Sequence, residues 1–311
     1  MAKLEFKKAD FERFVAQFDQ LSVERMIDDL VSISDSRRYV TNGYETALVR
    51  TLCDRIGKRQ PTSCIRLGDG EGDILGVGDP QYGEMTMVAA QRTVLRQFGV
   101  QLPMSELLTL RQLLSASVAA ADVVGIPMLS RIRGVFRRIQ EPNVDIRGSC
   151  GTINAVRCTV PLIRNSPKMP IITDCFFHRF LLPYFAEIIG SRECLGLVSC
   201  HAELPEKLVH HFSVAKIDFY QIPDEFMNHH QIPEKPHYRQ RFDEVISTLR
   251  LREPGQIFLV AAGVLGKIYC HRVKVLGGIA IDIGSMADVW TGKPTLRPYQ
   301  TDEFVERWKL L

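Results

Sequence analysis

The sequence predicts an α/β protein with a doubly wound, mainly parallel, Rossmann-like sheet and an N-terminal helical extension. From about residue 60 onward, short apolar segments alternate with segments of helical periodicity, which is typical of a parallel sheet with helices on its faces. The apolar segments also lack strict polar–apolar alternation, as expected of strands that are covered on both faces. We therefore place the helical extension at residues 1–58 and the α/β domain at residues 59–311.

Periodicity and the breaks at glycine and proline delimit the individual elements. In the N-terminal part, Phe11, Phe14 and Phe18 recur at helical spacing, so residues 9–57 are expected to be helical. Further helices are expected at 84–98, 105–119, 178–189, 205–212, 238–251 and 265–276. The expected strands are 63–67, 122–127, 170–173, 194–199, 216–222, 256–261 and 279–283.

The composition is that of an ordinary globular protein. The 311 residues are 45% hydrophobic and 24% charged, which is enough chain to bury a core without disulfides. A net charge of only +3 and the lack of a recognised motif disfavour nucleic-acid binding. The eight cysteines contain no C-x-x-C pair and are expected to be reduced and mostly buried. The charged N-terminus and the lack of an apolar run of ~18 residues predict a cytoplasmic protein with, at most, peripheral membrane contact.

The first candidate site follows the strand at 63–67. Residues 66–73 place the carboxylates of Asp69, Glu71 and Asp73 at alternate positions between glycines. Carboxylates this close repel one another, and a divalent cation is the usual compensation. Oxygen ligands suit Mg²⁺ or Mn²⁺, which share their coordination with diphosphate oxygens. The alternative interpretation is a solvated acidic turn.

Two further loops end strands near the C-terminus. Gly263, Gly266 and Lys267 follow the strand at 256–261 and lead into a helix, where backbone N–H groups and a lysine favour phosphate. The spacing differs from that of a P-loop, and a tight strand–helix turn is the alternative. Asp282 ends the last expected strand.

Basic and aromatic side chains lie near other strand ends. His178 and Arg179 begin a helix after the expected strand at 170–173, where they are placed to meet an anionic group. His201 is placed similarly, although a histidine at a strand end often has a structural role. Trp290 either stacks on a sugar ring or packs in the core.

Two parts of the chain resemble a known family. The segment from Ile65 to Glu71, I-R-L-G-D-G-E, resembles the R-[aromatic]-G-D-G-E signature of GT-D glycosyltransferases. The segments that begin at Ala261 and Gly278 are similar to that family's C-terminal pattern, A-x-G-x-x-x-K followed by A-I-D-I-G, so the resemblance covers about residues 60–292. It implies a GT-D type fold in which Asp69 and Glu71 bind Mn²⁺ or Mg²⁺ and the diphosphate of a UDP-sugar.

The sequence departs from the family in three places. Leu67 replaces the aromatic residue, Arg179 is the one residue retained from an S-R-P segment, and Ser285 stands where the family continues H-x-D. The resemblance still implies a hexosyltransferase that moves a sugar from a nucleotide-sugar donor to a glycan or glycoconjugate, in surface polysaccharide or glycoprotein biosynthesis. The departures leave the donor sugar and the acceptor open.

Each candidate residue has an expected role. Asp69, Glu71 and Asp282 are the expected catalytic residues, and the first two are also the metal ligands. An inverting transferase needs a base for the acceptor hydroxyl, and the sequence does not rank Asp282 against the other candidates. Those candidates are Asp73, His201 and Glu203, and the expected donor-binding residues are Arg66, Gly68, Gly70, Arg179, Gly263 and Lys267.

Two other functions remain open. A methyltransferase would use the glycines at 68–72. It would also need a second strand that ends in an acidic residue ~20 residues later, but residues 84–98 are expected to be helical. Alternatively, the same fold serves as a non-catalytic nucleotide-sugar-binding partner in a polysaccharide assembly. The intact Asp69-Gly-Glu triplet argues against that alternative.

Overall fold

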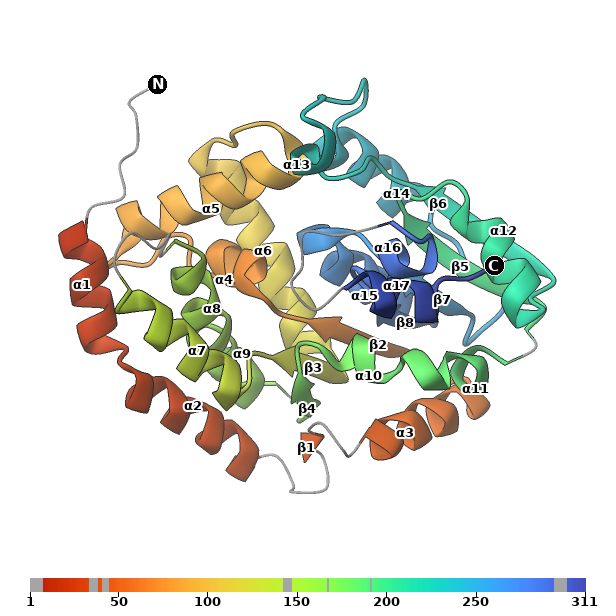
Figure 1. Cartoon of the computed structure of the whole chain (residues 1–311), viewed down its shortest axis with the longest axis horizontal. Helices are drawn as coiled ribbons and strands as arrows, with labels where there is room; N and C mark the ends of the chain where they lie inside the picture. The colour runs from red at the N-terminus through yellow and green to blue at the C-terminus, as the bar shows by residue number, and fades with distance from the viewer. Residues whose placement is uncertain are drawn as a thin grey trace. The chain divides into compact units, whose positions relative to one another are not determined.

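The computed structural model describes residues 8–33, 39–40, 45–141, 147–166, 168–190, 192–293 and 301–311. The chain forms two compact units (Figure 1). The first comprises Met1–Val40, Arg66–Cys175 and His229–Gln231, and the second comprises Thr41–Ile65, Phe176–Asn228 and Ile232–Leu311. The helices before residue 58 are divided between the two units, and the boundary expected between residues 58 and 59 stays a prediction.

The first unit contains three short parallel strands in the order β1 (Tyr39–Val40), β4 (Ile171–Asp174) and β3 (Val123–Ile126). Val123 and Val124 are fully buried neighbours, which explains why β3 lacks polar alternation. The helices of this unit are α1 (Lys8–Gln17), α2 (Gln20–Ile33), α4 (Asp69–Leu75), α5 (Gly83–Phe98), α6 (Met104–Ala120), α7 (Leu129–Ile139), α8 (Arg147–Arg157) and α9 (Thr159–Arg164).

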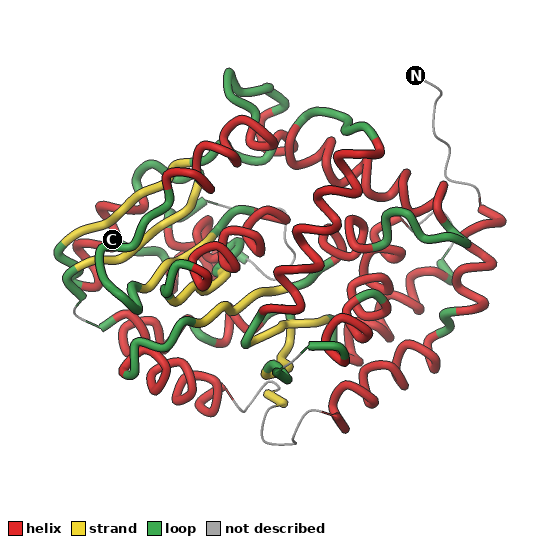
Figure 2. Tube along the Cα trace, turned by 180° about the vertical axis from the view of Figure 1, so that it is seen from behind, coloured by secondary structure: helices red, strands yellow, loops and turns green. Residues whose placement is uncertain are grey.

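The second unit is built on five parallel strands (Figure 2). Their order is β2 (Thr62–Arg66), β8 (Ile279–Asp282), β7 (Ile257–Val260), β5 (Cys194–Ser199) and β6 (Lys216–Gln221). Their connections include α3 (Glu45–Gly57), α10 (Phe177–Phe180), α11 (Phe185–Ile189), α12 (Leu204–Phe212), α13 (Phe226–His229), α14 (Phe242–Thr248), α15 (Gly266–Val275), α16 (Met286–Trp290) and α17 (Asp302–Trp308), with one-turn segments at Leu182–Tyr184, His237–Arg241 and Gly263–Leu265.

The predicted parallel α/β architecture is confirmed. Every expected strand is present, with bounds shifted by one residue at most. The expected helix at 178–189 is divided into α10, a short turn at Leu182–Tyr184 and α11, because Pro183 has no N–H to continue the helical ladder. Residues 69–75, expected to form a turn, are a helix instead.

Aromatic packing in the second unit decides the role of Trp290. Its side chain is 2% exposed. The ring packs edge-on against Phe185, with the centroids 4.9 Å apart, and against Phe212 at 6.0 Å. Trp290 is therefore a core residue, and its ring is not available for stacking on a sugar.

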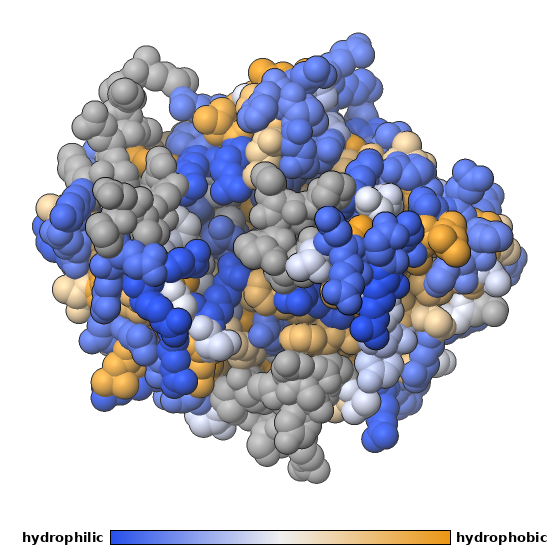
Figure 3. Space-filling view, in the orientation of Figure 1, coloured by the Kyte–Doolittle hydropathy of each residue, from blue (hydrophilic) through white to orange (hydrophobic). Residues whose placement is uncertain are grey.

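The surface is mostly polar. Apolar residues form separate small patches on the face seen in Figure 3, and the large exposed apolar side chains are scattered over several elements of both units. Within the described residues, no helix is both long and apolar enough to cross a membrane.

Candidate functional site

The acidic segment after β2 is the first turn of helix α4. Gly68 is its N-cap, with extended φ and ψ of −113° and −158°, and its N–H donates to Oε2 of Glu71 at 2.7 Å. Asp69 and Glu71 lie in the first turn, where the partial positive charge of the helix end stabilises carboxylates. Part of the carboxylate clustering in the sequence is thus explained by helix capping.

The glycines of this segment allow α4 to pack against α8. A methyl group at Gly72 would overlap the carbonyl oxygen of Gly151, and one at Gly151 would overlap the carbonyl oxygen of Asp69. A Cβ at Gly148 would lie 3.7 Å from Oδ2 of Asp69, so the Asp69 carboxylate lies beside the first turn of α8. These glycines are needed for close helix packing, a role that their spacing alone did not reveal.

Asp73 is the most deeply buried of the three acids. Its side chain is 4% exposed, and Oδ2 accepts a hydrogen bond from Thr93 Oγ1 at 2.8 Å. Burial, followed by the negative charge of Asp69, raises the pKa of Asp73 well above its ordinary value. Asp73 therefore belongs to the packed side of α4, and Asp69 and Glu71 are the remaining oxygen donors.

These donors fit a cation only in part. Among the described residues, no group of three or more His, Cys, Asp or Glu side chains is arranged to hold a metal ion. Mg²⁺ commonly binds through one or two carboxylates together with substrate phosphates. The half-buried Asp69 and the oriented Glu71 fit that kind of site, in which the ligand supplies the other oxygens.

Arg66 ends β2, directly before the acidic segment. Its Nη1 donates to the carbonyl oxygen of Cys175 at 3.3 Å, just after the end of β4. The N–H of Leu67 donates to the carbonyl oxygen of Gly125 in β3 at 2.8 Å. The backbone that leads into α4 is therefore held at the carboxyl ends of β3 and β4, where parallel sheets bind their ligands.

In the second unit, three predicted residues meet in one buried cluster. The Nζ of Lys267 lies 3.0 Å from Oδ2 of Asp282, and both side chains are 2% exposed. Lys267 also donates to the carbonyl oxygen of Gly263 at 2.9 Å. Because Val260 and Asp282 are paired in register, the cluster joins the turn after β7 to the end of β8. In this conformation the ammonium compensates a carboxylate of the protein.

A second polar cluster in this unit follows β5. The Nε2 atom of His201 lies 2.9 Å from Oδ1 of Asp288, and its Nδ1 lies 3.1 Å from Nζ of Lys293. Lys293 also forms an ion pair with Glu203 at 3.0 Å. Since a lysine ammonium has only donors, we assign the proton of His201 to Nε2, which donates to Asp288. Both ring nitrogens are then engaged, and neither Lys293 nor this network was predicted.

Arg179 contacts aromatic rings. Its guanidinium is 5.7 Å from the ring centroid of Phe176 and 5.8 Å from that of Phe304, so it lies between two aromatic rings. Such contacts stabilise a cation in place.

The comparison with family models matches residues 44–148 to the GT-D fold-like domain. Residues 44–148 are therefore similar to a GT-D-like domain. This match confirms the resemblance of the Ile65–Glu71 segment, which lies inside the matched residues. It begins within the expected N-terminal extension, and it does not include the similar segments that begin at Ala261 and Gly278.

The other comparisons add two solved structures. No curated protein matches the chain. One similar structure, with a TM-score of 0.46, is described as "Selenomethionine substituted structure of domain of unknown function 1792 (DUF1792)". The other, with a TM-score of 0.45, is described as "The highly conserved domain of unknown function 1792 has a distinct glycosyltransferase fold". Each is 14% identical and is matched over 80% of this chain and 79% of its own.

The predicted site residues therefore fall into three groups. The GT-D-like domain places Arg66, Gly68, Asp69, Gly70 and Glu71 together at the start of α4. The buried cluster of the second unit holds Gly263, Lys267 and Asp282, and the third group is Arg179 with its two aromatic rings.

Proposed function

We propose that this protein is a metal-dependent hexosyltransferase. It moves a sugar from a nucleotide-diphosphate donor, a UDP-sugar, to a glycan or glycoconjugate acceptor in surface polysaccharide or glycoprotein biosynthesis. The observation that carries the proposal is the Asp69-Gly70-Glu71 triplet, which starts α4 within the GT-D-like domain. It directly follows a buried parallel strand, the position at which doubly wound sheets bind ligands.

Asp69 and Glu71 would hold Mg²⁺ or Mn²⁺ through carboxylate oxygens. When bound, the ion neutralises the negative charge that develops on the leaving diphosphate. The N–H of Gly68 orients the Glu71 carboxylate, and the packing of Gly72 against Gly151 fixes the helix that carries both acids. This fixed arrangement supports the proposal, because donors that are oriented in advance reduce the reorganisation that binding requires.

The acceptor base is open among the same four candidates, and contacts in the second unit bear on three of them. Asp282 lies 3.0 Å from the ammonium of Lys267, so its buried carboxylate is already engaged with a cation. His201 has both ring nitrogens engaged. Glu203 is paired with Lys293. Burial raises the pKa of Glu203, but a backbone hydrogen bond to its carboxylate and the hydrogen bond from Lys293 outweigh burial, so the pKa lies below its ordinary value.

Two alternatives are less favoured by the geometry. A methyltransferase of the kind considered from the sequence needs a second strand with an acidic end soon after β2. Residues 67–122 are all described and contain α4, α5 and α6 but no strand. A non-catalytic nucleotide-sugar-binding protein would retain donor binding without turnover, so turnover separates it from the hexosyltransferase.

Donor turnover tests the proposal. The wild type is incubated with a panel of UDP-hexoses, Mn²⁺ and candidate acceptors, and released UDP is measured with and without EDTA. We expect metal-dependent release that falls by a factor of about 100 or more in Asp69→Asn, since losing one group that stabilises developing charge costs about that much. The exposed Asp28→Asn is the matched control. Equal turnover in the Asp69 variant would rule out the assigned role.

A further inference from the structure

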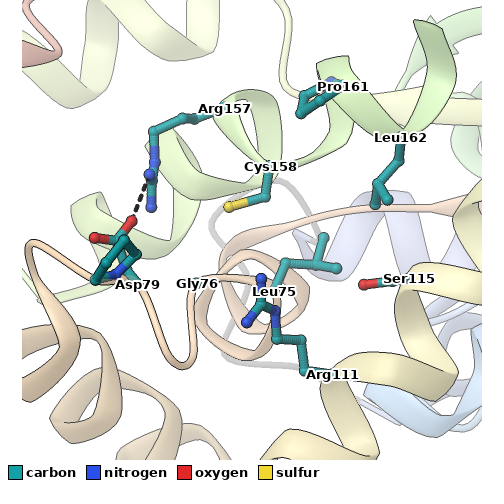
Figure 4. Close-up of a pocket in the computed structure, with 10 residues that line it drawn as sticks. Leu75, Gly76, Asp79, Arg111, Ser115, Arg157, Cys158, Pro161 and Leu162 are labelled. Carbon is teal, nitrogen blue, oxygen red and sulfur yellow. Dashed lines mark hydrogen bonds and ion pairs between the residues drawn. The ribbon is translucent and has the colours of Figure 1, made fainter. Parts of the chain in front are cut away.

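A pocket of the first unit lies away from the acidic triplet. It has a volume of about 260 Å³ and is bounded by the end of α4, by α6, by the end of α8 and by α9 (Figure 4). Asp69 begins α4 and Leu75, which lines the pocket, ends it, so the two residues are roughly 9 Å apart along the helix axis at 1.5 Å per residue. The pocket is therefore a separate cavity with its own side chains.

Two polar groups of α6 face this pocket. Arg111 and Ser115 are four residues apart on one face of the helix, and Figure 4 shows both head groups directed into the cavity. In the part of the chain that the structure describes, neither side chain has a hydrogen bond or an ion pair. A half-buried guanidinium without a carboxylate partner is a positive charge available to a ligand.

Arg157 on α8 supplies a third donor group, and its position is fixed. Its Nη1 donates to Oδ2 of Asp79 at 2.6 Å and its Nε to Oδ1 of Asn154 at 2.9 Å (Figure 4 shows the contact with Asp79). The guanidinium also lies 4.9 Å from the ring centroid of Phe18. The remaining nitrogen, Nη2, is buried and has no hydrogen-bond partner among the described residues. Nη2 is enclosed, so the donor that Arg157 can offer in the pocket it lines is the second N–H of Nη1, which uses its other N–H on Asp79.

Arg111 and Arg157 line the same pocket. Both affect the thiol of Cys158 in the pocket wall: burial raises the pKa of Cys158, and the charges of Arg157 and Arg111 lower it in part. Asp79 compensates the charge of Arg157, so the net positive charge of the pocket comes from Arg111. Leu75 and Leu162 add apolar surface beside these donors.

We propose that this pocket binds a small phosphate monoester, with the phosphate on Arg111, Ser115 and Arg157. Donors that come from separate helices suit the tetrahedral phosphate better than a planar carboxylate, which a single guanidinium binds in two-point fashion. The volume of about 260 Å³ is below the usual range of 300–1,000 Å³ for ligand pockets. It fits a sugar phosphate and is too small for a whole nucleotide sugar. This inference does not depend on the hexosyltransferase proposal.

Isothermal calorimetry with glucose 1-phosphate tests the inference. The wild type should bind the phosphate ester saturably, while glucose and glucuronate, titrated in parallel, should bind at least tenfold more weakly. Arg111→Gln should lose about tenfold or more in affinity, as expected for a charge-assisted hydrogen bond. Ser115→Ala should lose a smaller factor, and Arg138→Gln, which removes an exposed arginine of the same unit, should bind like the wild type.

Three results would overturn the inference. They are no saturable binding of glucose 1-phosphate to the wild type, equal affinity in Arg111→Gln, or glucuronate binding as tightly as the phosphate ester. Thermal unfolding of each variant checks that it is folded. Ser115→Ala, which keeps every charge, provides a second measure if Arg111→Gln alters the fold.

Discussion

Removing the ammonium of Lys267 should destabilise the second unit strongly. The substitution Lys267→Met keeps the length of the side chain but leaves the Asp282 carboxylate, which is 2% exposed, without its partner at 3.0 Å. Breaking a buried pair on one side costs about 3–5 kcal/mol, because the remaining charge stays desolvated. The lost hydrogen bond to the Gly263 carbonyl adds about 1 kcal/mol.

Urea unfolding followed by tryptophan fluorescence measures this effect. The chain has two tryptophans, Trp290 and Trp308, and both belong to the second unit, so the signal reports the unit that contains the pair. The exposed Lys216→Met is the matched control and should change the free energy of unfolding by about 0.5 kcal/mol or less.

The double variant Lys267→Met/Asp282→Leu decides whether the loss comes from the uncompensated charge. It replaces the buried pair by apolar side chains, and such replacements are often neutral or stabilising. We therefore expect it to recover most of the stability lost in Lys267→Met. A loss below about 1 kcal/mol in the single variant, or a double variant no more stable than the single one, would refute this reasoning.

Two further predictions concern packing and pH. Gly72→Ala should destabilise the first unit by about 1–3 kcal/mol, because the added methyl group overlaps the Gly151 carbonyl oxygen. The control is Gly83→Ala, where the added methyl group meets open space. In thermal unfolding, this control should be neutral or slightly stabilising. His237 is buried, and its Nε2 lies 3.1 Å from Tyr269 Oη. Burial lowers the pKa of His237 to about 3. Between pH 6.5 and 3, the imidazole is therefore protonated in the unfolded chain but not in the folded chain. The free energy of unfolding should therefore decrease by up to ~1.4 kcal/mol for each unit by which the pH is lowered in this range. In urea titrations at several pH values, His237→Gln should remove this contribution to the pH dependence.

The strands were predictable because they are local and apolar. Segments such as Cys194–Ser199 are buried along their whole length, and such runs can be recognised without knowledge of their neighbours. The helix α4 was missed because its glycines have low intrinsic helix propensity. Packing against Gly151 of α8, together with the Glu71 cap, outweighs that propensity, and neither contact is visible in a single segment.

The candidate site was predictable in its residues but not in its pairings. Lys267 and Asp282 were both singled out, yet nothing in their spacing shows that they neutralise each other across β7 and β8. The contact between His201 and Lys293 spans 92 positions of the chain and likewise depends on the fold. Long-range pairing of charged groups follows from strand order, which a motif does not encode.

The central claim is that Asp69 and Glu71 hold a metal–diphosphate group. Calorimetric titration of UDP tests it directly, with Mn²⁺ present or omitted, in the wild type, Asp69→Asn and the exposed control Asp28→Asn. We predict that UDP binding by the wild type and the control depends on Mn²⁺. The Asp69 variant should lose at least about tenfold in affinity, or 1.4 kcal/mol. Equal UDP affinity in Asp69→Asn, or affinity unaffected by Mn²⁺, would contradict the claim.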